Sequence, residues 1–332
     1  MTKREGSWRS SSLDRKNNTI PLALKTPFLT RLYLYVEKGV FLVTHGSFLG
    51  LVFLAQGLPL KVAYGIASPV GDLLFLLWRR GRGNAIDNMR YVLGREAADL
   101  EVYRTAQRSF RNYMKLLVDF VRLPRTSDEE VERRVRVEGW EHLDRALEGG
   151  KGVLLVGSHL GSWDLAGLAL AARGHELYVV AERQKPPWLD RTARDWREAR
   201  GIHLIFMERT LKPLFRALTR NQLVGIVVDR PLPQGDGVTV EFFGQMISWP
   251  SGPAALALRT GAQVITGYLV RTLDGHFKGE IFPPLEFQPR GDRFEDLRRL
   301  SQEIVTLQEE LIRRYPDQWY MFRRMWPSSR WR

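Results

Sequence analysis

The chain has 332 residues, of which 44% are hydrophobic, so it is long enough for one large α/β domain with a helical appendage or for two modest domains. It contains no cysteine, which excludes disulfide bonds, thiolate metal sites and a cysteine nucleophile. Its 50 lysines and arginines against 37 acidic residues give a formal charge of +13. We therefore expect an anionic partner, which could be a phosphate-bearing lipid, a nucleic acid or an acidic carrier protein.

The N-terminal part of the chain is polar and basic before it becomes apolar. Residues 1–25 are predicted to be disordered, and residues 26–82 are predicted to be a hydrophobic helical membrane anchor. Within the anchor, residues 39–60 carry no charged side chain, and as a helix they would extend about 33 Å, close to the thickness of a hydrocarbon core. This stretch could span a bilayer, lie in its surface or be a buried core helix. It begins too late to be a cleavable signal peptide.

A second apolar stretch, residues 62–78, carries only Asp72 and ends in the basic run at 79–83. That run would form a basic collar at the level of the lipid headgroups. Residues 84–93 and 97–123 then show apolar side chains at three and four spacing, which predicts two amphipathic helices.

Beyond residue 135 the pattern changes to short apolar runs separated by segments of helix length. These runs lie at residues 153–156, 177–180, 204–206, 224–228 and 264–270. Strands that alternate with helices predict a mostly parallel central sheet flanked by helices, and hence an α/β domain over residues 83–332. Two further strands, at 238–243 and 277–282, are expected on an edge of the sheet, where they could run antiparallel.

His159 follows the first of these strands, in a turn that leads into a helix. Because ligands bind outside the carboxyl ends of strands in an open parallel sheet, His159 should face the binding crevice. Asp164 comes five residues later, and with Ser162 as N-cap it would lie in the first helical turn, where the helix dipole keeps a carboxylate ionised. Five residues of continuous helix would leave the two side chains some 140° apart, so they meet only if Gly157 and Gly161 allow a sharp turn.

Two interpretations of this pair remain open from the residues alone. In the first, Asp164 accepts the Nδ1 proton of His159, fixes the tautomer and leaves Nε2 free as a base. In the second, Asp164 only stabilises the start of the helix and His159 is a hydrogen-bonded turn histidine. His203 and Glu208 have the same spacing, and there the second interpretation is favoured because no glycine turn follows.

The sequence from His159 to Asp164 resembles the HX4D motif of the lysophospholipid and lipid A acyltransferase superfamily. More narrowly, the chain is similar to the branch that contains the late lipid A acyltransferases and the mycobacterial phosphatidylinositol mannoside acyltransferases. The similarity is carried by residues 88–93, 159–167, 229–230 with 240–244, 252–261 and the closing segment 315–324. It covers residues 57–326 and implies a glycerolipid acyltransferase-like fold.

The resemblance implies that His159 is the general base on an acceptor hydroxyl and that Asp164 orients it. It also implies four pocket residues, Glu182, Arg197, Arg230 and Glu241. From the residues themselves, Glu182 and Asp229 each follow an apolar strand and so reach the carboxyl edge of the sheet. The alternative is that the implied pocket residues are ordinary partners in surface salt bridges.

The activity implied by the resemblance is transfer of a fatty acyl chain from acyl-CoA or acyl carrier protein to a hydroxyl of an anionic membrane glycolipid or phospholipid. Neither a metal nor another cofactor is expected, because the acyl thioester is a co-substrate. The resemblance also implies a location at the cytoplasmic membrane, with the catalytic domain on its cytoplasmic face. A lipid A precursor and a mannosylated phosphatidylinositol are both open as acceptors.

Three other functions compete with this hypothesis. A catalytically inactive membrane-binding or scaffold protein could keep the same fold. A metal-dependent hydrolase could use His159, Asp164 and Asp229, although the sequence has no HxH or HExxH ligand pair. Binding of nucleic acid ranks last, because no glycine-rich phosphate loop, zinc finger or RNA-binding pattern accompanies the positive charge.

Overall fold

The computed structural model describes residues 46–207, 211–233 and 235–326. The chain divides into two compact units, Met1–Leu54 and Ala55–Arg332. The predicted disorder at 1–25 and the start of the apolar stretch at 39–60 lie outside the described residues. The rest of that stretch contains a helix at Gly46–Gly57, which runs across the division. The following description concerns the second unit.

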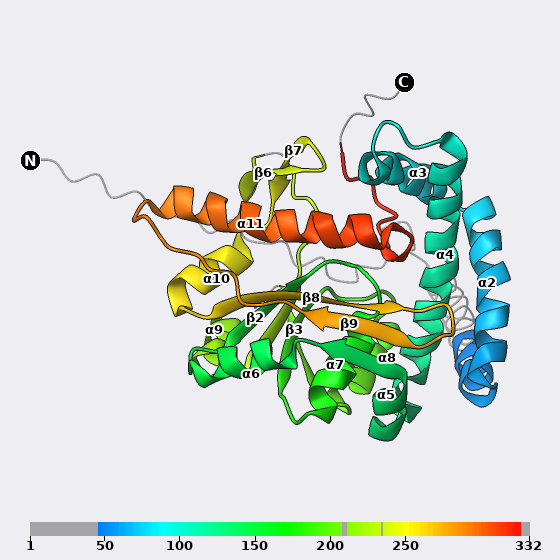
Figure 1. The fold of residues 1–332 in the computed structure, drawn as a ribbon. Coiled ribbons are helices and arrows are strands. Elements are labelled where there is room, and N and C mark those ends of the chain that lie inside the picture. The colour runs from blue at the N-terminus through cyan, green and yellow to red at the C-terminus, as the bar shows by residue number, and fades with distance from the viewer. Residues whose placement is uncertain (1–45, 208–210, 234, 327–332) are drawn as a thin grey trace, which may run out of the picture. The chain divides into compact units, whose positions relative to one another are not determined.

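A seven-stranded sheet forms the centre of this unit (Figure 1). Its strands are β1 (Val135–Glu138), β2 (Val153–Gly157), β3 (Leu177–Ala181), β4 (Ile202–Phe206), β5 (Leu223–Val227), β8 (Gln263–Arg271) and β9 (Phe277–Ile281). In the order β1-β9-β8-β2-β5-β3-β4, the five strands from β8 to β4 are parallel to one another. The predicted mostly parallel sheet is confirmed.

Two of the strand predictions need correction. The strand at 277–282 runs antiparallel to β8, but it is not an edge strand, because β1 pairs with its other side. The strand at 238–243 does not join the sheet. It becomes β6 (Val238–Phe242), which forms a separate hairpin with β7 (Gln245–Trp249). Phe243 and Gly244 both have positive φ angles, and this backbone turns the chain back on itself at once.

Helices cover both faces of the sheet. This is required because successive apolar side chains of β2 point to opposite faces. They are α5 (Asp128–Arg134), α6 (Trp140–Glu148), α7 (Trp163–Ala172), α8 (Pro187–Glu198), α9 (Leu211–Thr219), α10 (Gly252–Thr260) and α11 (Arg293–Arg314). Leu154 and Val156 pack in one core cluster with residues of α10 and α11. Val153 packs in the other, with residues of α6 and α7. The domain is therefore a three-layer arrangement with its polar loops at the ends of the strands.

The predicted N-terminal helices are α2 (Leu60–Leu77), α3 (Arg79–Leu93) and α4 (Asp99–Arg122), which lie beside one another at one end of the sheet (Figure 1). The basic run at 79–83 forms the first turns of α3. Small residues of α2 face α4, and a Cβ atom on Gly71 would lie only 2.6 Å from Cα of Arg111. Glycine at this position lets the two helix backbones approach closely.

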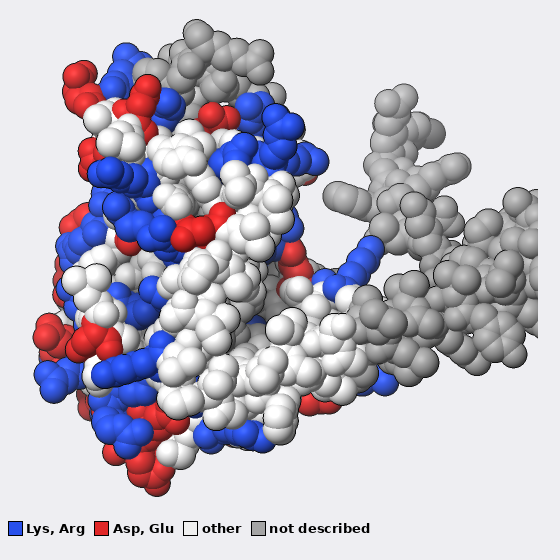
Figure 2. All heavy atoms as spheres, turned by 90° about the vertical axis from the view of Figure 1, so that its right-hand side faces the viewer, with Lys and Arg blue, Asp and Glu red and all other residues white. Residues whose placement is uncertain are grey.

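The opposite face of α2 is exposed and apolar. Among the described residues, α2 is the one helix whose length and composition would allow it to cross a membrane, and only 28% of it is buried. Its exposed apolar side chains are 41–68% accessible and include Val62, Ile66, Val70, Leu73 and Leu77. Their spacing of three and four places them on one stripe. Figure 2 shows uncharged residues as a band over this side of the molecule, with lysines and arginines at its margins.

The close approach at Gly71 predicts a position-specific loss of stability. Gly71→Ala should lower the free energy of unfolding by about 1–3 kcal/mol, because the new methyl group has to displace the backbone of α4. Gly65→Ala is the matched control in the same helix, since nothing lies within 4 Å of its Cβ position, and alanine should there stabilise the helix by up to about 1 kcal/mol. Chemical unfolding of the two variants measures both effects. Equal stabilities would contradict the close helix contact.

Candidate functional site

The turn that carries His159 is clamped between two other segments. It leaves β2 at Gly157 and enters α7 at Trp163. Gly161 has a φ of 66°, and a Cβ atom there would lie 2.0 Å from the carbonyl oxygen of Leu269 in β8. The amide of Gly161 donates to the carbonyl of Gln318, and that of Ser162 donates to the carbonyl of Leu269. The sharp turn expected at Gly161 is therefore present, and only glycine fits it without displacing β8.

The carboxylate that holds His159 is Asp229. His159 Nδ1 lies 2.6 Å from Asp229 Oδ1, and the backbone amide of His159 donates to Asp229 Oδ2 at 2.8 Å. Trp319 Nε1 donates to the same Oδ2 at 2.7 Å. The prediction that Asp164 accepts the Nδ1 proton is thus wrong.

The parallel register explains this pairing. Gly157 of β2 is opposite Val227 of β5, an offset of 70 residues, and His159 and Asp229 continue the same offset two residues beyond their strands. Asp164 is separated from His159 by a glycine turn and the first turn of a helix, and its side chain points to a different element. His159 therefore pairs with the carboxylate that follows the neighbouring strand and not with the carboxylate that is nearer in sequence.

Asp229 is an ionised carboxylate in a fully buried position. Burial alone would raise its pKa, but the charge of His159 and the hydrogen bonds from His159 and Trp319 together hold the pKa below its ordinary value. An ionised carboxylate can only accept, so the proton of the Nδ1 hydrogen bond belongs to the imidazole. In the neutral form of an imidazole held in this way, Nε2 carries the lone pair, and the side chain of His159 keeps 15% of its surface exposed. This nitrogen can take a proton from a molecule that reaches it.

Asp164 and Arg197 form a separate ion pair. Arg197 of α8 binds both carboxylate oxygens of Asp164, at 2.7 and 3.2 Å, and its guanidinium lies over the ring of Phe120, 4.7 Å from the centroid. Asp164 is buried at the start of α7, where the side chain of Ser162 makes no capping hydrogen bond. The pair joins α7 to α8. Asp164 thus lies in the first turn of α7, as expected, and its hydrogen bonds go to α8.

Glu182 and Arg230 lie together at the carboxyl edge of the sheet. They follow the neighbouring strands β3 and β5, and Arg230 forms an ion pair with Glu182. The hydrogen bond from Arg230 lowers the pKa of Glu182 against the effect of burial, and the charges of Arg323 and His159 lower it further. The structure thus brings Glu182 and Arg230 into the surroundings of His159.

Glu241 is not brought into this group. It lies on the exposed side of β6, where its backbone amide and carbonyl bind the side-chain amide of Gln302 in α11. Among the described residues, no hydrogen bond or ion pair joins its carboxylate to His159, Glu182 or Arg230. The antiparallel hairpin carries it away from the sheet to which the sequence had assigned it.

The closing segment supplies contacts that the sequence did not predict. Trp319 is fully buried, binds Asp229 and forms a β-bridge with Leu160, and the amide of Tyr320 donates to the carbonyl of His159. Trp163 sets its ring edge against His159, with centroids 5.5 Å apart. The available signal was the position of Trp319 within the segment 315–324 that carries the resemblance. That signal gave no indication of a partner 90 residues away.

The proposed metal ligands of a hydrolase are not assembled. No group of three or more histidine, aspartate and glutamate side chains suited to a metal ion occurs in residues 46–207, 211–233 and 235–326. Asp164 binds Arg197, and both oxygens of Asp229 already accept hydrogen bonds. These contacts give no support to the hydrolase hypothesis.

The fold and these contacts define an α/β protein with a carboxylate-held histidine at the carboxyl edge of its sheet, the arrangement in which an imidazole can work as a base. The chain belongs to the bacterial lipid A biosynthesis acyltransferase family, whose model matches residues 36–328. The family predicted from the sequence motifs is therefore confirmed.

Individual relatives support the narrower branch as well. The chain is 29% identical to the phosphatidylinositol mannoside acyltransferase of Mycolicibacterium smegmatis over 245 residues, which cover 72% of this chain and 77% of that protein. It is 30% identical to the protein of the same description from Mycobacterium tuberculosis, over 66% of this chain and 69% of that one. With the lipid A biosynthesis palmitoleoyltransferase of Escherichia coli it shares 23% identity, over 83% of this chain and 88% of that protein.

The hydrogen bond from Trp319 predicts a pH-dependent contribution to stability. At neutral pH, Trp319→Phe should lower the free energy of unfolding by about 1–3 kcal/mol, because it removes a donor from a buried carboxylate. Since the folded-state pKa of Asp229 is depressed, this contribution is present above the pKa of the unfolded aspartate and is lost as the pH falls through the folded value. The difference from wild type, measured by chemical unfolding, should therefore shrink toward acid pH.

Trp326→Phe is the matched control. Its indole nitrogen is buried and finds no hydrogen-bond partner among the described residues, so its removal should cost no hydrogen bond at any pH. A loss in Trp319→Phe that stays constant with pH, or that equals the loss in the control, would contradict a charge-assisted bond to Asp229.

Proposed function

We propose that the protein transfers a fatty acyl chain from an acyl thioester, acyl-CoA or acyl carrier protein, to a hydroxyl of a membrane glycolipid or phospholipid. The observation that carries the proposal is the pairing of His159 with Asp229 at the carboxyl edge of the sheet, in a chain that belongs to an acyltransferase family. The relatives with 29–30% identity favour a mannosylated phosphatidylinositol as the acceptor, because the lipid A acyltransferase is only 23% identical.

In this mechanism His159 is the general base. Its Nε2 takes the proton of the acceptor hydroxyl while that oxygen attacks the thioester carbonyl, and a tetrahedral oxyanion forms. The imidazolium is stabilised by the negative charge of Asp229, to which its Nδ1 is bound. When the intermediate collapses, the C–S bond breaks and the leaving thiolate receives the proton from Nε2. The products are an ester and a free thiol, so no redox step or metal is required.

The remaining predicted site residues take two kinds of role in this proposal. Glu182 and Arg230 are proposed to bind polar groups of the acceptor, because they form an exposed charged pair beside His159. Asp164 and Arg197 are proposed as positioning residues, since they fix α7 against α8 and α7 begins directly after the turn that carries His159. Glu241 makes no contact that supports a place in the pocket.

Replacement of the base should abolish transfer without unfolding the protein. We expect His159→Ala to lose at least about 10³-fold in acyl transfer, measured as release of free thiol from an acyl thioester in the presence of acceptor lipid. Asp229→Asn should lose about 10³–10⁴-fold, because an amide opposite Nδ1 no longer fixes the required tautomer. Near-normal turnover in His159→Ala would refute the general-base role. If the wild type itself consumed no thioester, the inactive scaffold would be the alternative.

Asp164→Asn is the matched control for the choice of carboxylate. It keeps the shape of the side chain and leaves the contacts of His159 intact, but it weakens the ion pair with Arg197. We expect it to reduce the free energy of unfolding and to retain far more activity than Asp229→Asn. If Asp164→Asn were the more damaging change for turnover in the folded protein, the assignment of Asp229 would fail.

We also propose that α2 binds the surface of the cytoplasmic membrane and keeps the catalytic domain on its cytoplasmic side. One face of α2 packs against the protein. There Tyr64 donates a hydrogen bond to Asp119 and accepts hydrogen bonds from Arg134 and Arg271. The other face is the exposed apolar stripe, and Arg79, Arg80 and Arg82 follow it. A helix with one face packed against the protein and the other face apolar and exposed suits the plane of the interface better than a path through the bilayer.

Charges on the stripe should detach the protein from lipid. Ile66→Asp/Leu73→Asp should weaken binding to vesicles that contain anionic phospholipid by at least about tenfold, measured by co-sedimentation, because two half-exposed apolar side chains no longer enter the bilayer. Leu100→Asp/Phe294→Asp is matched in charge and exposure but lies off α2. Equal binding of both double variants would show that α2 does not contact the membrane.

A further inference from the structure

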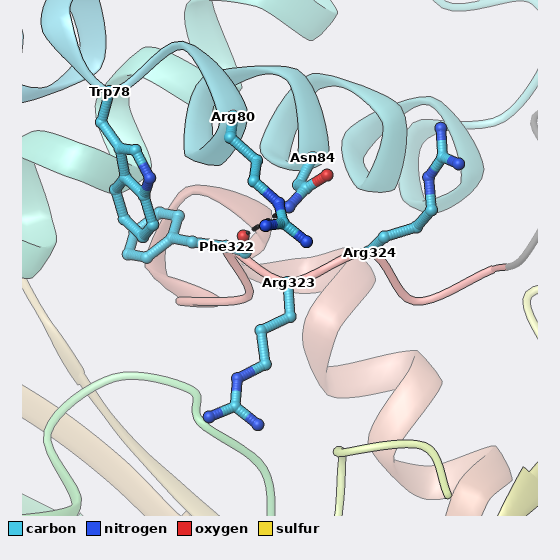
Figure 3. A pocket seen from close by; sticks show the side chains of 6 residues that line it. All are labelled: Trp78, Arg80, Asn84, Phe322, Arg323 and Arg324. Atoms are coloured by element: carbon cyan, nitrogen blue, oxygen red, sulfur yellow. Dashed lines mark hydrogen bonds between the residues drawn. The ribbon is translucent and has the colours of Figure 1, made fainter. Parts of the chain in front are cut away.

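A basic pocket lies between the start of α3 and the closing segment of the chain. It encloses about 700 Å³. Its lining consists of three arginines, two aromatic residues and one asparagine: Arg80, Arg323, Arg324, Trp78, Phe322 and Asn84 (Figure 3). No acidic residue lines it, so the local charge is strongly positive.

The backbone of the pocket is held in place by two asparagines one turn apart in α3. Asn84 donates to the carbonyl of Phe322, and Asn88 donates to the carbonyls of Met321 and Arg323. Asn88 also accepts from the amide of Met325 and is completely buried. The segment therefore cannot slide along α3 without breaking buried hydrogen bonds, and the positions from which its arginines extend are fixed.

The guanidinium groups are only partly neutralised. Arg324 lies 3.4 Å from Asp87, whereas Arg323 is 67% exposed and comes no closer than 3.9 Å to Glu182. For Arg80, no ion pair is found among the described residues. In Figure 3, Arg80 extends from α3 over the backbone of residues 322–324, and Arg323 extends from that backbone on the side away from α3. Arg80 and Arg323 both line the pocket and come from different elements, and a guanidinium group suits a phosphate.

The pocket is connected to the candidate active site by the chain itself. Tyr320 binds the carbonyl of His159, and three residues further on Arg323 borders the pocket. The Cα atoms of Tyr320 and Arg323 are therefore at most about 11 Å apart. Arg323 also lies near Glu182, whose pKa is lowered by the charge of His159.

A row of aromatic rings follows the same path. Trp163 contacts His159 at 5.5 Å between centroids, and Tyr320 lies 6.1 Å from Trp163. Tyr113 lies 5.6 Å from Tyr320 and 5.2 Å from Phe322, and Phe322 lies 5.9 Å from Trp78. Trp78 directly follows the apolar stripe of α2. A phosphate in the pocket would therefore sit between the proposed membrane face and His159.

We propose that this pocket binds a phosphate group of a substrate while the reacting group of the same substrate lies at His159. The inference rests on the proposed function for the identity of the substrate, since the phosphate can come from the phosphodiester of an acceptor lipid or from coenzyme A. Both ligands carry a phosphate, the group that the arginines lining the pocket suit.

Binding without turnover tests the proposal. The full-length chain is titrated calorimetrically with two probes, coenzyme A and sn-glycero-3-phosphoinositol, each of which lacks the reacting acyl group. We expect at least one probe to bind, and Arg80→Gln/Arg323→Gln to weaken it by at least about tenfold. If the double variant loses affinity for coenzyme A alone, the pocket binds the donor. If it loses affinity for glycerophosphoinositol alone, the pocket binds the acceptor.

Arg220→Gln is the charge control, because Arg220 is exposed and immediately precedes the loop before β5, at the opposite end of that strand from Asp229. The proposal is overturned if neither probe binds, if the double variant binds both as wild type does, or if the control loses as much affinity. His159→Ala should bind the probes normally. If that variant kept its transferase activity while the arginine variant lost binding, the proposed function would fail and the phosphate site would stand.

Discussion

The buried carboxylate of Asp229 is the constraint on which the site depends. A charge removed from water is costly unless donors surround it, and here the donors come from two distant segments: the turn after β2 and the closing segment at Trp319. The carboxylate is satisfied only when β2 lies beside β5 and when residues 316–320 have folded over the edge of the sheet. The geometry of His159 is therefore a property of the finished tertiary structure.

A second buried charge cluster connects the same edge of the sheet to the N-terminal helices. Asp119 of α4 pairs with Arg134 and Arg271, and Tyr64 of α2 binds all three side chains. Arg271 ends β8, and its backbone amide and carbonyl both bind the side chain of Gln318. Gln318 is the residue whose carbonyl holds the turn at Gly161. A short chain of direct contacts thus joins the apolar helix α2 to the turn of His159, so the position of one constrains the position of the other.

The parts of the fold that could be predicted are those encoded by local pattern. The five apolar runs were recognisable as strands of a parallel sheet because they alternate with segments of helix length. The helices at 84–93 and 97–123 were predicted from their apolar spacing, and the helix at 62–78 from its apolar composition. β1 was missed because Arg136 and Glu138 interrupt its four residues. The order of strands has no local signature, so Asp229 could be placed at the carboxyl edge but not beside His159. For the same reason the strand at 238–243 was expected on an edge of the sheet, whereas it pairs with β7, which was not predicted.

The spacing of His159 and Asp164 now has a physical explanation that differs from direct contact. A step of five residues places His159 at the end of β2 and Asp164 in the first turn of α7, where it meets Arg197 across the helix interface. Arg197 belongs to α8, which connects β3 to β4, and β3 carries Glu182 at its end. The short motif therefore contains one residue at the crevice and one residue that ties the following helix to the next βα unit. The two residues of the motif thus belong to one βα unit, while the carboxylate that contacts the imidazole follows another strand.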